Sequence, residues 1–133
     1  MTRKEAREEV FILIFEKIFN DESAGSLLEL ASLVRDITPD DYIEDTFKGV
    51  CDKQTEIDGI ISRLAVGWNI SRISKTSLAV LRLAIYEMKY NDSIPVSVSI
   101  NEAVEICKKY ATKEDASFVN GILSSVAKEI ENA

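Results

Sequence analysis

Histidine is absent from this 133-residue chain. Its absence removes the side chain that most often moves protons near neutral pH, and with it histidine-assisted serine or cysteine catalysis. Only two cysteines are present, Cys51 and Cys107, which are too few for a structural zinc site or for the disulfide framework of a small secreted domain. We expect both thiols to be buried and reduced.

Loops that bind nucleotide phosphates are also missing. The five glycines form neither a G-x-x-x-x-G-K-[S/T] nor a G-x-G-x-x-G motif. No apolar run approaches the roughly 20 residues of a membrane span, and no secretory signal follows the N-terminal charges. Carboxylate pairs such as Asp40 and Asp41 are typical of a solvated helix face. These absences predict a cytoplasmic protein that is not an enzyme and that needs no metal or cofactor.

Negative charge is abundant but unevenly distributed. The net charge is −7, which opposes simple attraction to phosphate. Residues 20–62 hold eleven acids and three bases, a balance of −8, so the rest of the chain carries +1. One face can therefore hold a small basic patch while another repels nucleic acid. Such a protein would bind RNA weakly alone and more tightly beside a second protein on the same RNA.

Apolar residues recur every three or four positions along the whole chain, and short polar turns separate these segments. We expect helices over about residues 4–19, 26–34, 39–67, 76–90, 99–109 and 113–130. This pattern predicts an all-α, compact orthogonal bundle of about six to seven helices, formed by residues 1–133 as a single domain. The N-caps expected are Thr2, Thr38, Ser74 or Ser77, and Thr112 or Asp115.

Gly67 and Trp68 mark the expected end of the long helix. Gly67 suits the left-handed position after a helix, and Trp68 is expected to fold into the core between the two halves of the chain. The following helix, residues 76–90, is apolar around most of its circumference. We therefore expect it to be central or to contact a partner.

The segment from residue 95 to residue 121 contains the most specific patterns. Ser99 and Glu102 have the spacing of a capping box, which predicts that a helix starts at Ser99. The run Phe118-Val-Asn-Gly121 has two interpretations. In one, Phe118 fills the core and Gly121 lets a neighbouring helix approach closely. In the other, Phe118 lies in the first turn of the last helix, where phosphate binds the helix N-terminus and bases stack on an aromatic ring.

Four segments together resemble the NusB family of bacterial transcription antitermination factors. They are R-K-E-A-R at residues 3–7, W-N-I-S-R-I at 68–73, V-L-R-L-A-I-Y-E at 80–87, and I-N-E-A-V-E-I-C-K at 100–108 followed by S-F-V-N-G at 117–121. They occur in the family's order over nearly the whole chain. The resemblance implies two three-helix groups sharing one core, with the long third helix either broken or continuous.

The resemblance also implies a function. A protein of this family would bind the single-stranded boxA element of nascent ribosomal RNA together with the ribosomal protein NusE, within the transcription elongation complex. Charge alone favours local pairing at the start of the first helix, for example between Lys4 and Glu8. The family instead implies that the basic residues there contact RNA. The implied RNA-binding residues are Arg3, Lys4, Arg7, Phe15, Lys113 and Phe118.

On this interpretation, the start of the first helix and the start of the last helix form one cationic rim for unpaired nucleotides. The family further implies that the region of residues 76–90 docks NusE, which makes Tyr86 and Glu87 candidate interface residues. The alternative is a helical protein–protein docking or dimerisation module without specific RNA binding. A homodimer is compatible with either interpretation, since helix surfaces this apolar often pair symmetrically.

Overall fold

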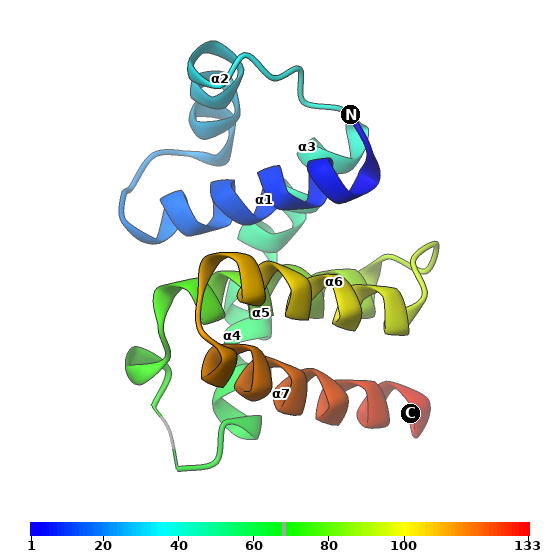
Figure 1. Cartoon of the computed structure of the whole chain (residues 1–133). Coiled ribbons are helices and arrows are strands. Elements are labelled where there is room, and N and C mark those ends of the chain that lie inside the picture. Colours follow the sequence, from blue (N-terminus) through cyan, green and yellow to red (C-terminus); the bar gives the residue numbers. More distant parts are fainter. Residues whose placement is uncertain (68) are drawn as a thin grey trace.

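A computed structural model of the chain describes residues 1–67 and 69–133. These residues form seven α-helices and one short 3-10 helix, with no strand among them (Figure 1). The prediction of an all-α fold with six to seven helices is confirmed. In chain order the elements are α1 (Arg3–Ile18), α2 (Ala24–Val34), α3 (Asp41–Asp52), α4 (Gln54–Leu64), η1 (Ile70–Arg72), α5 (Lys75–Tyr90), α6 (Val96–Tyr110) and α7 (Lys113–Glu131).

Helix α5 is the centre of the fold. It packs against α1, α3, α4, α6 and α7, and its residues 77–85 are all buried. Helices α1, α2 and α3 contact one another above it in Figure 1, where α6 overlaps α5 in the middle of the view and α7 lies below; α6 and α7 pack on α5 and on each other. The two expected three-helix groups are therefore α1–α3 and α5–α7, and α4 joins the second group. The apolar circumference of α5 is explained by this central position.

The start of α1 has the expected cap. The Thr2 hydroxyl accepts the backbone N–H of Glu5 at 3.0 Å, and the Glu5 carboxylate accepts the N–H of Thr2 at 2.8 Å. These reciprocal bonds form a capping box, which satisfies two donors that a helix start leaves unpaired. The turn fixes the backbone at the very residues that the sequence singled out for RNA contact.

The long helix expected over residues 39–67 is broken in two. Helix α3 ends at Asp52 and α4 starts at Gln54, with Lys53 as the only residue between them. The break lets both segments bury their apolar faces, represented by Phe47 in α3 and Ile61 in α4. The N-cap also differs from the expectation, because the Asp40 carboxylate, and not Thr38, accepts a backbone N–H of α3.

Helix α6 begins before Ser99, so the predicted capping box is wrong. The helix starts at Val96, directly after Pro95. Ser99 lies in the first turn of the helix, where it is buried and donates its hydroxyl to the Glu87 carboxylate at 3.0 Å. A buried carboxylate needs such donors, and this need outweighs the local capping pattern. Glu102 instead lies 3.7 Å from the Lys4 ammonium.

Two glycines have roles that the structure makes clear. Gly67 adopts a φ of +80°, which confirms its expected left-handed conformation after α4. Gly49 lies where α3 crosses α5, and a β-carbon there would overlap the Tyr86 ring. Gly121, in contrast, is exposed, and an added β-carbon would meet nothing within 4 Å. The expected helix approach at Gly121 is therefore wrong, and Trp68, the predicted core anchor, lies outside the described residues.

Both thiols are free, in agreement with the expectation of reduced cysteines. Cys107 is buried and Cys51 is only half-buried. Burial, with a smaller contribution from Asp115, raises the pKa of the Cys107 thiol to about 11. Within the described ranges, no helix is both long and apolar enough to cross a membrane.

Candidate nucleic-acid interface

The first turn of α1 presents two cations to solvent. The Arg3 guanidinium lies 4.1 Å from the centre of the Tyr42 ring, a cation–π contact with helix α3. Arg3 is exposed and forms no salt bridge among the described residues, so its guanidinium can also meet a phosphate. Lys4 is largely exposed, and among the described residues its one salt bridge is the 3.7 Å contact with Glu102. Arg3 and Lys4 therefore occupy accessible positions.

Arg7 occupies the core instead. It is 4% exposed, and its Nε donates to both carboxylate oxygens of Glu87, at 3.1 and 3.0 Å. Glu87 is 1% exposed and also accepts the hydroxyls of Tyr42 and Ser99. Burial lowers the pKa of Arg7, but the adjacent Glu87 carboxylate outweighs this effect, so the pKa of Arg7 is raised overall.

This pairing corrects two sequence-based assignments. Arg7 is not positioned to contact RNA, and Glu87 is not positioned to contact a partner, because each satisfies the other inside the protein. The sequence contained a signal for this arrangement. Arg7 has the helical spacing of the buried Val10 and Ile14, so it lies on the apolar stripe of α1.

Tyr86, the other candidate for partner contact, is half-buried. Its ring packs over Gly49 and lies 5.3 Å from the ring of Tyr90. Burial raises the pKa of the Tyr86 hydroxyl, and the nearby carboxylates of Asp45 and Asp52 add to this effect. Part of the side chain remains available for a contact on the α3–α5 side of the molecule.

A row of aromatic rings runs along α1 and onto the end of α6. Ring centres are 6.2 Å apart for Phe11 and Phe15, and 5.1 Å apart for Phe15 and Phe19. Tyr110 joins the row at 5.2 Å from Phe11. Phe15 is half-buried, whereas Phe19 is 61% and Tyr110 42% exposed. Phe19 and Tyr110 were not among the sequence-based candidates, although the spacing of four residues from Phe11 to Phe19 places three rings on one helix face.

Polar contacts join this part of α1 to the end of α6. Lys109 lies 2.6 Å from the Glu8 carboxylate, and the Tyr110 hydroxyl donates to the same carboxylate. Burial raises the pKa of Glu8, but these hydrogen bonds outweigh that effect and lower it overall. Thr112, the N-cap of α7, follows Tyr110 by two residues. The aromatic row therefore leads from α1 towards the start of α7.

The start of α7 packs against the start of α5. The Ser74 hydroxyl donates to the Asp115 carboxylate at 3.3 Å, and each residue belongs to the N-terminal cap or first turn of its helix. From Ser74 to Glu87, where Arg7 binds, α5 advances about 20 Å. In Figure 1, α1 begins on the right and α7 begins on the left. The two helix starts do not face each other, so the single cationic rim expected from the sequence is wrong. The start of α1 and the start of α7 are separate ends of the surface, and α1 with its aromatic row runs between them.

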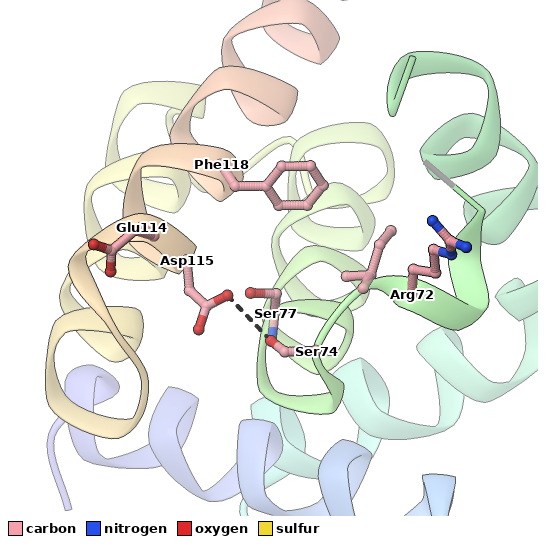
Figure 2. A pocket seen from close by; sticks show the side chains of 7 residues that line it. Arg72, Ser74, Ser77, Glu114, Asp115 and Phe118 are labelled. Atoms are coloured by element: carbon pink, nitrogen blue, oxygen red, sulfur yellow. Dashed lines mark hydrogen bonds between the residues drawn. The ribbon is translucent and has the colours of Figure 1, made fainter. Parts of the chain in front are cut away.

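A pocket of about 170 Å³ lies between the starts of α5 and α7 (Figure 2). In Figure 2, Phe118 projects over it from α7, Ser77 of α5 and the N-cap residue Ser74 lie below, and Arg72 lies to the right. Lys113, at the first position of α7, is exposed. Within the described part of the chain, Arg72, Lys75 and Lys113 form no salt bridge. The pocket is lined by Arg72, Ile73, Ser74, Ser77, Glu114, Asp115 and Phe118.

The surface formed by α1 and the starts of α5 and α7 suits the binding of unpaired nucleotides. Across residues 1–67 and 69–133, no group of three metal-ligating side chains is found. The surface has aromatic rings along α1 and at the end of α6, and near the starts of α5 and α7 it has cations that form no salt bridge among the described residues. Unpaired nucleotides are bound by this combination in many proteins, because bases stack on rings and cations neutralise phosphates.

The chain belongs to the NusB family, whose sequence model matches residues 4–128. The chain is 45% identical over 130 residues to the transcription antitermination protein NusB of Acetivibrio thermocellus, covering 96% of this chain and 90% of that protein. It is 41% identical over 133 residues to the protein of the same name from Agathobacter rectalis, covering 96% and 100% of the two chains.

Solved structures share the fold. T. maritima NusB superimposes with a TM-score of 0.84 at 34% identity, covering 97% of this chain and 92% of that chain. A second structure, of antitermination factors NusB and NusE in complex with dsRNA, gives a TM-score of 0.86 at 27% identity, covering 96% of both chains. The resemblance noted in the four sequence segments is thereby confirmed over the whole fold.

Proposed function

We propose that this chain is an RNA-binding adaptor of transcription antitermination that acts in the cytoplasm. It binds single-stranded RNA of the boxA type together with NusE, as part of the transcription elongation complex. The observation that supports an RNA-binding role beside NusE most strongly is the match, over 96% of the chain, to a solved NusB that is in complex with NusE and dsRNA. The family consists of antitermination proteins, so binding rather than catalysis is the activity to test.

The RNA contacts are distributed along α1 and across the start of α7. Arg3 and Lys4 neutralise phosphates at the first end, and Phe15 offers a ring in the middle of the row. Lys113 and Phe118 provide charge and a stacking face at the second end. Arg7 contributes indirectly from the core, because its ion pair with Glu87 holds α1 on α5.

Few cations take part, so RNA binding alone is expected to be weak. With a net charge of −7, the long-range field of the protein repels RNA. A partner protein that holds the same RNA raises the effective concentration of the second contact. Tyr86, on the α3–α5 side, is the residue we assign to that partner.

The test is the affinity for a boxA-type RNA, measured with and without NusE at two salt concentrations. Replacing both Arg3 and Lys4 by alanine should lower the affinity and reduce the salt slope by about 1.4, since each phosphate contact of a single strand contributes about 0.7. Lys128→Ala is the matched control, because it removes an exposed cation from the far end of α7. If the double variant and a scrambled RNA leave binding unchanged, the proposal fails.

The second candidate is a docking or dimerisation module. It is favoured by an exposed apolar strip on α2, where Leu33 and Val34 are both more than three-quarters exposed. Strips of this kind often mark a protein contact. Sedimentation of the wild type and of Leu33→Glu distinguishes the two candidates, because a dimer formed through α2 would dissociate in the variant while binding of RNA would persist.

A further inference from the structure

An open groove of about 300 Å³ lies between α2 and α3. Leu28 and Leu33 of α2, together with Pro39 from the segment before α3, give it apolar walls. Helix α2 packs against α1 and α3 and lies at the upper edge of the bundle in Figure 1. The groove is therefore on the periphery of the fold, where another molecule can reach it.

Ion pairs fix the end of α2 beside this groove. Arg35, the C-cap of α2, donates to the carboxylates of Glu9 and Glu16 in α1, each at 2.9 Å. The position of α2 is thus set before any partner arrives. A preformed groove costs a partner less conformational entropy than one that has to open on binding.

An apolar strip on α2 extends the groove to the surface. Leu30 is about half exposed, and Leu33 and Val34 are more than three-quarters exposed. These three residues have the spacing i, i+3 and i+4, so they share one face of the helix. Single exposed apolar residues are ordinary, whereas an adjacent set beside a groove is typical of a contact surface.

The surroundings of the groove are acidic. Glu29 of α2 and Glu44 of α3 line it, are exposed, and form no salt bridge among the described residues. Lys48 is the one base in the lining. Residues 20–48 hold eight acids and two bases, and the other base, Arg35, is already paired with α1. A partner therefore meets apolar walls within a negative field.

This combination restricts the occupant. The negative field repels the phosphates of RNA. A symmetric contact between two copies would bring the same acidic patch against itself, which is also repulsive. No strand occurs among the described residues, so a partner has no sheet edge to extend here. The remaining match is a helix that has one apolar face and carries positive charge beside it.

We propose that the groove between α2 and α3 docks a basic amphipathic helix of a partner protein. Apolar side chains of that helix pack against Leu30, Leu33 and Val34, as ridges of one helix pack into the grooves of another. Its Lys and Arg side chains pair with Glu29 and Glu44. This docking site is independent of the proposed RNA binding, which uses α1 and the start of α7.

The experiment titrates the full chain with three labelled peptides of about 15 residues, a length at which an isolated helix is marginally stable. The first peptide has a leucine face flanked by lysines. The second has glutamate in place of every lysine, and the third has the composition of the first with its leucines spread around the helix. Only the first should bind by fluorescence anisotropy, and added salt should weaken it. Amide NMR signals that shift on binding should belong to α2 and α3.

Leu33→Ala tests the apolar strip. Removal of most of this exposed side chain should lower the affinity for the first peptide by about 3- to 10-fold, since part of its apolar contact is lost. Val66→Ala is the matched control, because Val66 is 85% exposed and lies outside the groove. It should leave the affinity unchanged.

A charge reversal tests the acidic lining. Glu29→Lys combined with Glu44→Lys should lower the affinity for the lysine-flanked peptide on the order of 10-fold and should let the glutamate-flanked peptide bind. Asp92→Lys combined with Glu131→Lys is the control. It changes the net charge by the same amount at exposed positions after α5 and at the end of α7, and it should have little effect.

Several results would overturn the inference. If the three peptides bind equally, or if none binds, the groove does not recognise a basic amphipathic helix. Signals of α2 that shift with protein concentration alone would assign the groove to a second copy of the chain. Signals of α2 and α3 that shift with a boxA-type RNA would assign it to RNA. Failure of the chain to bind RNA would overturn only the proposed function, because the peptide titration contains no RNA.

Discussion

Arg7 of α1 and Glu87 of α5 form an ion pair inside the core, with the Arg7 Nε 3.0 Å from a Glu87 carboxylate oxygen. Tyr42 from α3 and Ser99 from α6 donate their hydroxyls to the same carboxylate. One acidic side chain therefore joins four helices that belong to both three-helix groups. This network also helps to position the exposed Arg3 of α1, since the Arg3 guanidinium lies against the ring of Tyr42.

Breaking the buried pair should be costly. Glu87→Ala leaves the Arg7 charge buried without a partner, and removal of one member of such a pair typically destabilises a protein by about 3–5 kcal/mol. Urea unfolding of the variant measures the change in the free energy of unfolding. Arg63→Ala, which breaks the exposed pair with Glu129, is the control and should change stability little. A small effect of Glu87→Ala would mean that water reaches Arg7.

The network explains why the sequence assigned Arg7 to the wrong role. A cluster of basic residues at a helix start is typical of RNA contact, and charge alone does not tell which of them turns inward. Arg3 and Lys4 remain outside, while Arg7 follows the apolar stripe to a carboxylate eighty positions away in the chain. Long-range pairing of this kind leaves no local trace in one sequence. A charged residue within an apolar stripe, on α1 and again on α5, is the nearest available signal.

Stability should fall at alkaline pH through Tyr42. Burial, strengthened by the negative charge of Glu87, raises the pKa of the Tyr42 hydroxyl well above its ordinary value of 10.0. Below pH 10 the hydroxyl is protonated in both the folded and the unfolded chain, so its stabilising contribution is complete. Above pH 10 the unfolded chain releases this proton while the folded chain retains it, so unfolding becomes more favourable by about 1.4 kcal/mol per pH unit.

Tyr42→Phe removes this titration, and its free energy of unfolding should decline less steeply than that of the wild type between pH 10 and 11.5. The variant starts from a lower stability, because Glu87 loses one donor. Tyr110→Phe is the comparison: the hydrogen bond to Glu8 raises the pKa of Tyr110 as well, but this tyrosine is 42% exposed, so its removal should flatten the slope less than removal of the Tyr42 hydroxyl. Equal slopes for the wild type and Tyr42→Phe would show that Tyr42 titrates normally.

The ring of Tyr42 should also matter for RNA binding by holding Arg3 in position. Tyr42→Phe keeps the ring under the guanidinium and should bind a boxA-type RNA as the wild type does, whereas Tyr42→Leu should lose as much affinity as Arg3→Ala. Combining Tyr42→Leu with Arg3→Ala should cost little more than either change alone, which a double-mutant cycle measures. If the two losses of RNA affinity add up, Tyr42 does not act through Arg3.

Patterning predicted the helices more completely than the site. The apolar spacing located five of the seven helices to within about three residues, merged α3 and α4 into one, and indicated that α5 is central or contacts a partner, because burial of one face is a local property of the sequence. The break at Lys53 and the start of α6 at Val96 depend on packing against α5, which spacing does not report. The pocket beside Phe118 depends on two helix starts that are nearly forty residues apart. Phe118 alone was visible in advance, through its place in the first turns of the last helix.

Gly49 and Gly121 provide a matched pair of substitutions. Both lie within helices, where alanine is favoured over glycine by about 1 kcal/mol. At Gly121 the added methyl group meets nothing within 4 Å, so Gly121→Ala should raise the free energy of unfolding by about 0.5–1 kcal/mol. At Gly49 the same methyl group overlaps the Tyr86 ring, and the rearrangement it forces should cost about 1–3 kcal/mol.

Urea unfolding of both variants tests this contrast, and RNA titration of Gly121→Ala extends it. Because Gly121 is exposed one turn after Phe118, a stabilised variant with unchanged RNA affinity would show that no bound group approaches the backbone there. A stabilised variant with weakened RNA affinity would place the RNA against this turn of α7. A destabilised Gly121→Ala would contradict the open surface seen at that position, since neither helix propensity nor steric overlap could then account for the loss.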